Sequence, residues 1–223
     1  MKKQVTQLQI GLMMLIVFGV LSLLVFQVTN FSVHLFLIWN ALLASVSFFI
    51  SSWIVEKQPK SKWVWGLAFL VSLLFLPNAI YMVTDLMYLN HYLFYEDSPI
   101  SMGWIYAENI VGYIAMIHLF LGALLGLWFA IQSIRHWLSE GQRYFSSRMV
   151  YWFLPLISFV SSVAVYLGRF LRLNSWDVIL PWRVVVKVWE NIDLVFFEFV
   201  GVFTIFQILL FGTILILKKH RQS

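Results

Sequence analysis

Long runs of apolar residues, interrupted by short polar segments, dominate the chain. Each run holds about 20 residues with few charges, which is the length that an α-helix needs to cross a bilayer. The runs lack the strict apolar and polar alternation of a half-buried strand. Because hydrocarbon cannot satisfy exposed backbone groups, we expect about six membrane-spanning helices. The expected spans are residues 8–28, 31–55, 63–84, 110–131, 149–168 and 194–217.

Composition supports a membrane environment for the whole chain. Hydrophobic residues make up 61% of the 223 residues and charged residues 11%, against roughly 45–50% and about 25% in soluble domains. No low-complexity linker separates the spans into units. We therefore expect a single transmembrane domain over residues 1–223, an all-α integral membrane protein built as a bundle of about six helices.

Basic residues are concentrated on one side of these spans. Of the 15 Lys and Arg, 11 lie at the termini or in the second and fourth connections. Basic residues resist translocation, so this side should be cytoplasmic and both termini should lie inside. The four basic residues expected outside are Arg169, Arg172, Arg183 and Lys187.

Acidic residues have the opposite distribution, because eight of the ten lie in or near the outer connections. Acidic residues contribute little to topology, so membrane insertion does not require this asymmetry. The outer face is therefore the expected place of function. The eight are Asp85, Glu96, Asp97, Glu108, Asp177, Glu190, Asp193 and Glu198.

A polar stripe follows the third span where it approaches the outer side. Pro77 favours a kink there, because it lacks a backbone N–H and its ring clashes with the preceding turn. Polar residues after it recur at spacings of three and four, so they would share one face of a helix. The stripe consists of Asn78, Tyr81, Asp85, Tyr88 and Tyr92.

A second polar cluster follows the fifth span on the same side. If this segment is helical, Arg169 and Arg172 are i,i+3 neighbours that together grip a carboxylate or phosphate. Asn174 and Asp177 then favour a turn or a cap. As an alternative to a ligand site, Asp85 pairs with one of the arginines and ties the third and fifth spans together.

These two segments, LPNAIYMVTD at 76–85 and YLGRFLRLNSWD at 166–177, resemble patterns of the bacterial membrane-protein family named domain of unknown function 1361. The resemblance extends over most of the chain. It implies a multi-pass protein of the bacterial cytoplasmic membrane, and it supplies no reaction.

No motif with an established chemistry accompanies these clusters. The absence of cysteine excludes disulfides and thiolate sites, and the five histidines show no pair at metal-ligand spacing. Phosphate-loop, dinucleotide and GxSxG patterns are missing as well. No metal or cofactor is implied, and basic residues confined to short loops give no basis for nucleic-acid binding.

Four residues inside the spans need separate explanations. His118 and Glu198 are ionisable groups in apolar runs, where such groups often mark ion or proton paths. For His118 we favour a neutral imidazole hydrogen-bonded between helices over a proton relay. Gly122 and Gly126 form a GxxxG motif, which favours close packing within the chain, with a homo-oligomer contact as the alternative.

We interpret the chain as a noncatalytic membrane protein whose outer face binds an anionic lipid headgroup or an envelope protein. Two alternatives stay open: a membrane enzyme that acts on a lipid-linked phosphate with Asp85 as general base, and a small transporter that uses His118, Glu198 and the interrupted third span. The expected ligand-binding residues are Asn78, Tyr81, Asp85, Arg169, Arg172, Asn174 and Asp177.

Overall fold

A computed structural model describes residues 2–97 and 104–220 of the chain. Within these ranges, six helices are long and apolar enough to cross a membrane, so the chain is a multi-pass membrane protein. Each corresponds to one expected span, which confirms the interpretation of the apolar pattern. The six are α1 (Lys2–Thr29), α2 (Val33–Lys57), α3 (Lys62–Thr84), α4 (Ile110–Gly141), α5 (Ser147–Phe170) and α7 (Leu194–His220).

The fourth spanning helix is longer than expected, because α4 continues past Ile131 to Gly141. Ile134, Trp137 and Leu138 are buried in this extension and recur at helical spacing. Their apolar face keeps the helix packed on its neighbours after the hydrocarbon thickness has been crossed. From the polar residues in this stretch, the sequence analysis had instead expected a loop between the fourth and fifth spans.

The two long connections contain shorter elements. The 3₁₀ helix η1 (Asp85–His91) continues directly from α3, and strands β1 (Tyr95–Asp97) and β2 (Trp104–Tyr106) then form an antiparallel pair before α4. Between α5 and α7 lie the 3₁₀ helix η2 (Ser175–Ile179) and the α-helix α6 (Pro181–Glu190).

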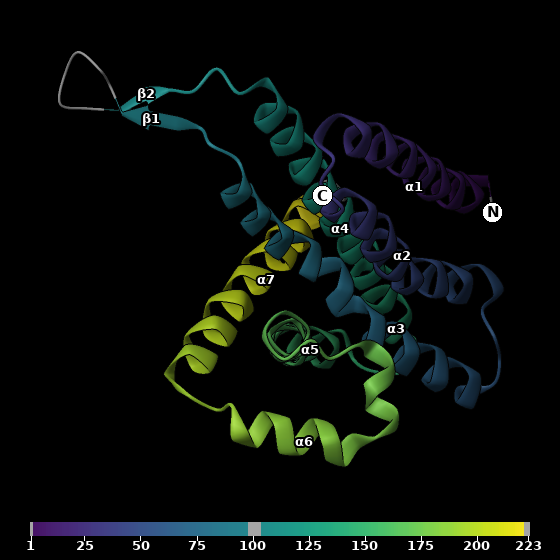
Figure 1. The fold of residues 1–223 in the computed structure, drawn as a ribbon. Coiled ribbons are helices and arrows are strands. Elements are labelled where there is room, and N and C mark those ends of the chain that lie inside the picture. Colours follow the sequence, from purple (N-terminus) through teal and green to yellow (C-terminus); the bar gives the residue numbers. More distant parts are fainter. Residues whose placement is uncertain (1, 98–103, 221–223) are drawn as a thin grey trace.

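Helices α2, α3 and α4 pack against one another, with α1 against α2 and α4, and α5 against α3 (Figure 1). Helix α7 packs mainly against α5. The main core lies mostly between α2, α3 and α4. It includes the fully buried rings of Phe48 and Phe129. A smaller cluster of Tyr166, Phe196 and Val200 joins the C-terminal end of α5 to the N-terminal end of α7.

Both glycines of the GxxxG motif face other helices of the same chain. A Cβ at Gly126 would meet the carbonyl oxygen of Ala79 in α3, and one at Gly122 would lie 3.1 Å from the ring of Phe18 in α1. The absence of side chains therefore lets α4 approach α3 and α1 closely. Packing within the chain is thus confirmed for this motif, whereas a homo-oligomer through Gly122 and Gly126 stays a prediction.

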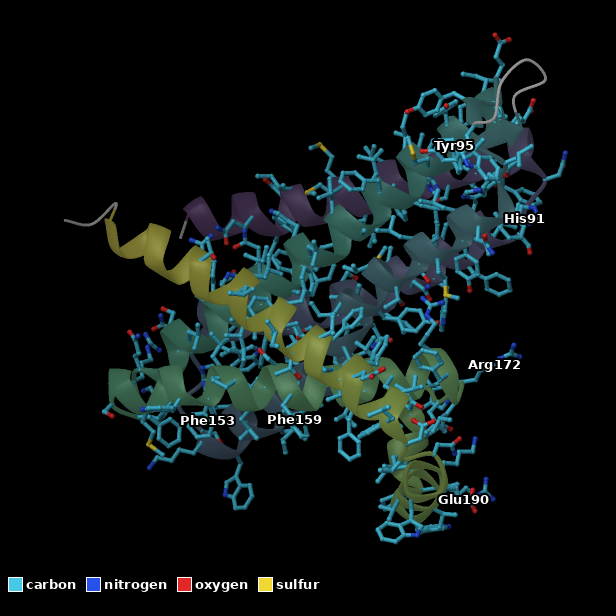
Figure 2. All side chains as sticks on the ribbon, turned by 90° about the vertical axis from the view of Figure 1, so that its left-hand side faces the viewer. His91, Tyr95, Phe153, Phe159, Arg172 and Glu190 are labelled. Carbon is cyan, nitrogen blue, oxygen red and sulfur yellow. The ribbon has the colours of Figure 1, made fainter. Side chains whose placement is uncertain are left out.

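Helix α6 was not expected, because the sequence suggested only an ordered loop there. Pro181 at its first position suits a helix start. Figure 1 views α5 almost along its axis with α6 lying across the field, and Figure 2, turned by 90°, views α6 along its axis. Helix α6 is therefore roughly perpendicular to α5. It exposes Trp182, Val185, Val186 and Trp189, as expected of a helix lying in the membrane interface.

Candidate functional site

A buried ion pair joins the C-terminal ends of α3 and α5. Asp85 begins η1 and Arg169 lies in the last turn of α5, with 2.5 Å between Asp85 Oδ1 and Arg169 Nη2. Only 1% of the Asp85 side chain and 7% of the Arg169 side chain are exposed. From α2, Asn40 Nδ2 donates a hydrogen bond to the other carboxylate oxygen of Asp85 at 3.0 Å. Three spanning helices therefore meet at one carboxylate.

The Arg169 guanidinium is occupied by groups of its own chain. Its Nε donates to Thr84 Oγ1 at 2.9 Å, and its Nη2 donates to the same oxygen. Its Nη1 donates to the Tyr88 hydroxyl at 3.4 Å. The Tyr81 ring lies with its centroid 4.0 Å from the guanidinium carbon, which is a cation–π distance. Arg169 therefore acts as a hub between α3, η1 and α5.

Arg172 lies apart from this hub. Helix α5 ends at Phe170, and Arg172 has a φ of 53°, so the two arginines are not i,i+3 neighbours on one helix. Its side chain is exposed and points away from the bundle (Figure 2). The expected paired grip by two arginines is therefore absent from this structure, because the helix stops between them.

A pocket of about 780 Å³ lies between α2, α3, α5 and α6 beside this hub. Its walls combine apolar side chains, mainly from α2, α3 and α5, with polar side chains from α2, α3, η1, α5 and the segment after α5. Phe36 and Trp39 of α2, which are 64% and 51% exposed, belong to its lining. The polar lining consists of Asn40, Asn78, Tyr81, Tyr88, Arg169, Arg172, Asn174 and Ser175.

Two of the seven expected site residues do not line the pocket. Asp85 lies behind Arg169, and Asp177 accepts a hydrogen bond from the backbone N–H of Asn174 at 2.6 Å as part of a capping box. The other five line it: Asn78, Tyr81, Arg169, Arg172 and Asn174.

Hydrogen bonds also hold the loop after α5 against α3. Asn78 Nδ2 donates to Ser175 Oγ at 2.9 Å, and Ser175 Oγ donates to the carbonyl oxygen of Leu74 at 3.3 Å. This carbonyl lies one turn before Pro77, which lacks a backbone N–H of its own. The polar pocket wall is therefore anchored to α3, which continues as one helix through Pro77.

The tyrosine stripe divides between two places. Tyr81 and Tyr88 reach Arg169, whereas the Tyr92 hydroxyl lies 3.1 Å from Nε2 of His34. The 3₁₀ geometry of η1 has three residues per turn rather than 3.6, so the expected single face no longer includes Tyr92.

Sequence reasoning overlooked Asn40 and Thr84, although both bind the ion pair. Asn40 stands within an apolar span, and a polar side chain at membrane depth is a signal that can be found from sequence. Thr84 carries no comparable signal, because a threonine at the end of a helix is common.

The structure confirms the hydrogen bonding expected for His118 and adds a contact between two histidines that was not expected. His118 is hydrogen-bonded between helices, as expected, through Ser22 of α1 and His34 of α2. The direct contact between His34 and His118 was missed, because the residues are 84 positions apart. Glu198 lies in the second turn of α7 with an exposed side chain, away from both histidines' hydrogen bonds.

Within the described ranges, no three or more His, Cys, Asp or Glu side chains cluster in a way that could hold a metal ion. The pocket instead presents guanidinium, amide and hydroxyl groups. These groups donate hydrogen bonds and suit an anion.

A family model described as "Protein of unknown function (DUF1361)" matches residues 39–210. This range includes both sequence segments that resemble the family and every pocket residue except Phe36. No curated protein and no solved structure matches the chain.

Proposed function

The chain belongs to the DUF1361 family of proteins of unknown function, and from that premise we propose that its outer pocket binds an amphiphile with an anionic headgroup, without catalysis. The observation that carries the proposal is Arg172. It lines the pocket, is exposed, and forms no ion pair with the residues that the structure describes.

The charges around the pocket favour an anion over a cation. Asp85 balances Arg169, so the pair contributes little net charge to the pocket. Arg172 then supplies an unbalanced guanidinium, whose planar N–H groups match two oxygens of a phosphate or carboxylate. The amide of Asn174, which also lines the pocket, adds a neutral donor beside it.

The apolar walls favour an amphiphile over a free anion. Phe36 and Trp39 line the pocket and are exposed on α2, so an acyl chain in the surrounding membrane would reach them without crossing the bundle. Leu43 and Leu74 extend the apolar lining further. An envelope protein bound through the same arginine is the competing outcome of the experiment below.

An enzyme reaction has less support. Asp85, the only expected general base, does not line the pocket, and both of its oxygens are engaged by Arg169 and Asn40. A general base must reach the proton that it abstracts. The transporter alternative lacks a connected path, because Glu198 shares no hydrogen bond with His118 in the described residues.

Replacing Arg172 by glutamine is expected to lower binding of an anionic lipid about tenfold, because a charge-assisted hydrogen bond contributes roughly 1.5–3 kcal/mol. The measurement is native mass spectrometry of protein loaded with equal amounts of phosphatidylglycerol and phosphatidylcholine. Inorganic phosphate, added in a separate arm, distinguishes a lipid from a free anion.

Lys187→Gln is the matched control, since Lys187 is an exposed cation on α6 that does not line the pocket. It should leave the ratio of the two lipids unchanged. Equal lipid ratios for the Arg172 variant and the wild type would contradict the proposal. Copurification of an envelope protein without any anionic lipid would also contradict it.

The proposal also requires the pocket to face outward, with both termini in the cytoplasm of a bacterial cell. Because the chain has no cysteine, single cysteines report the side of the membrane directly. Ser61→Cys and Gln142→Cys should react with an impermeant maleimide only after permeabilisation, whereas Asn90→Cys should react in intact cells. All three positions are exposed. The reverse labelling pattern would invert the topology and reject the outward pocket.

A further inference from the structure

A line of four polar side chains crosses from α1 to the outer segment, away from the pocket. Ser22 Oγ lies 2.8 Å from His118 Nε2, and the Nδ1 atoms of His118 and His34 are 2.9 Å apart. His34 Nε2 lies 3.1 Å from the Tyr92 hydroxyl. Ser22 and His34 are fully buried and His118 is 1% exposed. Helices α1, α2 and α4 thus meet at two facing imidazoles.

The direction of each hydrogen bond in this line follows from its inner end. Ser22 Oγ donates its single hydrogen to the carbonyl oxygen of Phe18 at 2.8 Å, and a carbonyl can only accept. Ser22 must then accept from His118 Nε2–H. A neutral imidazole carries one N–H, so His118 Nδ1 is an acceptor.

The outer half of the line is determined in the same way. Because His118 Nδ1 accepts, His34 Nδ1–H donates to it, and His34 Nε2 is left as an acceptor for the Tyr92 O–H. Tyr92 lies outside the membrane spans, and burial raises its pKa, so its hydroxyl keeps its proton. The two histidines therefore hold opposite tautomers.

This arrangement leaves one nitrogen for an additional proton. Both Nε2 of His118 and Nδ1 of His34 already carry hydrogen, and the gap between the two Nδ1 atoms has room for one proton only. An added proton must therefore bind His34 Nε2, on the side of Tyr92. The proton between the Nδ1 atoms can then move to His118, so that both rings share one positive charge.

We propose that the His34–His118 pair is a binding site for a single proton that arrives from the outer side past Tyr92. On uptake, His34 Nε2–H donates to the Tyr92 oxygen, whose own hydrogen turns away, and no other proton leaves the line. A second proton is excluded by repulsion between two imidazolium rings in contact. The line ends at a backbone carbonyl, so the site holds a proton rather than conducting it inward.

Aromatic rings surround the pair and suit a shared cation. Phe18 stacks on His118 with ring centroids 5.0 Å apart, and Phe31 meets His34 edge-on at 6.1 Å. An aromatic face attracts a cation most strongly where water is excluded.

The ionisable groups nearest to the pair come from the outer segment. They are Tyr92 itself, His91 and Tyr88. The His91 ring lies 5.3 Å from the Tyr92 ring and 4.1 Å from the Phe31 ring, and the Tyr88 ring lies 6.4 Å from the Phe31 ring. Helix α1 contributes only Ser22 and Phe18 to the line. No Asp, Glu, Lys or Arg in the described ranges forms a hydrogen bond or an ion pair with either imidazole.

The test is nitrogen-15 NMR of wild-type protein labelled at histidine and reconstituted in nanodiscs of phosphatidylcholine. At about pH 8, where an ordinary histidine is neutral, His34 should carry its proton on Nδ1 and His118 on Nε2. On acidification towards about pH 4, the signals of both rings should shift together, with one proton taken up in total. His34→Asn and His118→Asn assign the signals.

His91→Gln is the control, because His91 is exposed and takes part in none of the hydrogen bonds of the line, although its ring lies against those of Tyr92 and Phe31. It should leave the coupled pair unchanged. Identical tautomers at the two rings, separate uptake of one proton by each, or no uptake at all would each overturn the proposal. The result does not depend on lipid binding in the pocket, which involves other residues.

Discussion

Replacing Arg169 by methionine should destabilise the protein by about 3–5 kcal/mol, which is the usual cost of leaving one member of a buried ion pair without its partner. The Asp85 carboxylate, whose side chain is 1% exposed, would keep only the hydrogen bond from Asn40 among the described residues. Thr84 and Tyr88 would also lose the donor that they share. The measurement is denaturant-induced unfolding in bicelles.

The control for this variant is Arg172→Met. It makes the same chemical change three residues further along the chain, at an exposed side chain. We expect it to alter stability by no more than about 0.5 kcal/mol, as for most surface substitutions. Equal losses for the two variants would show that the buried pair does not hold α3 to α5.

A double-mutant cycle measures how strongly the contributions of Asp85 and Arg169 to stability depend on each other. Asp85→Asn combined with Arg169→Met removes both charges, so the pair should lose less stability than the sum of the two single changes. If the double variant costs no more than either single one and the folded fraction still binds anionic lipid, the pair is structural and Arg172 provides the anion contact.

The second large effect is expected at Gly126→Ala, with a loss of about 1–3 kcal/mol from overpacking. The added Cβ would meet the Ala79 carbonyl oxygen, and it would lie 2.9 Å from Met82 Cβ. Neither atom is the free end of a flexible side chain, so α3 and α4 must separate. Thermal unfolding in detergent measures the loss.

Two other glycines serve as controls for which smaller losses of stability are expected. At Gly122 the nearest atom is Cζ of Phe18 at 3.1 Å, the far end of a side chain that must shift by only a few tenths of an ångström, so its alanine variant should cost less. At Gly19 nothing lies within 4 Å of an added Cβ, and alanine should be tolerated. Similar losses at Gly126 and Gly19 would mean that the close approach of α3 and α4 does not support the fold.

The candidate site was only partly predictable. The sequence placed polar residues near the C-terminal ends of the third and fifth spans, because each group lies next to an apolar run whose ends can be read directly. It left open whether Asp85 meets Arg169 or Arg172. The choice depends on where α5 ends, and the left-handed conformation of Arg172 has no signal in its residue type.

Helix α6 shows a different limit. Its ten residues are too few to cross a membrane. Short amphipathic helices are only marginally stable in isolation, so local preference alone predicts them poorly. Two features favour a helix in this segment: Val184 packs beside the pocket, and the exposed apolar face suits the membrane interface.

By itself, the sequence determined that the chain spans the membrane through six helices, because the transfer of about 20 apolar residues into hydrocarbon is a local property of each segment. Only the tertiary structure decided that Asp85 pairs with Arg169 and that His34 faces His118. Both contacts join residues 84 positions apart. They depend on how each helix is rotated and shifted against its neighbours, which the packing of every side chain between them determines together.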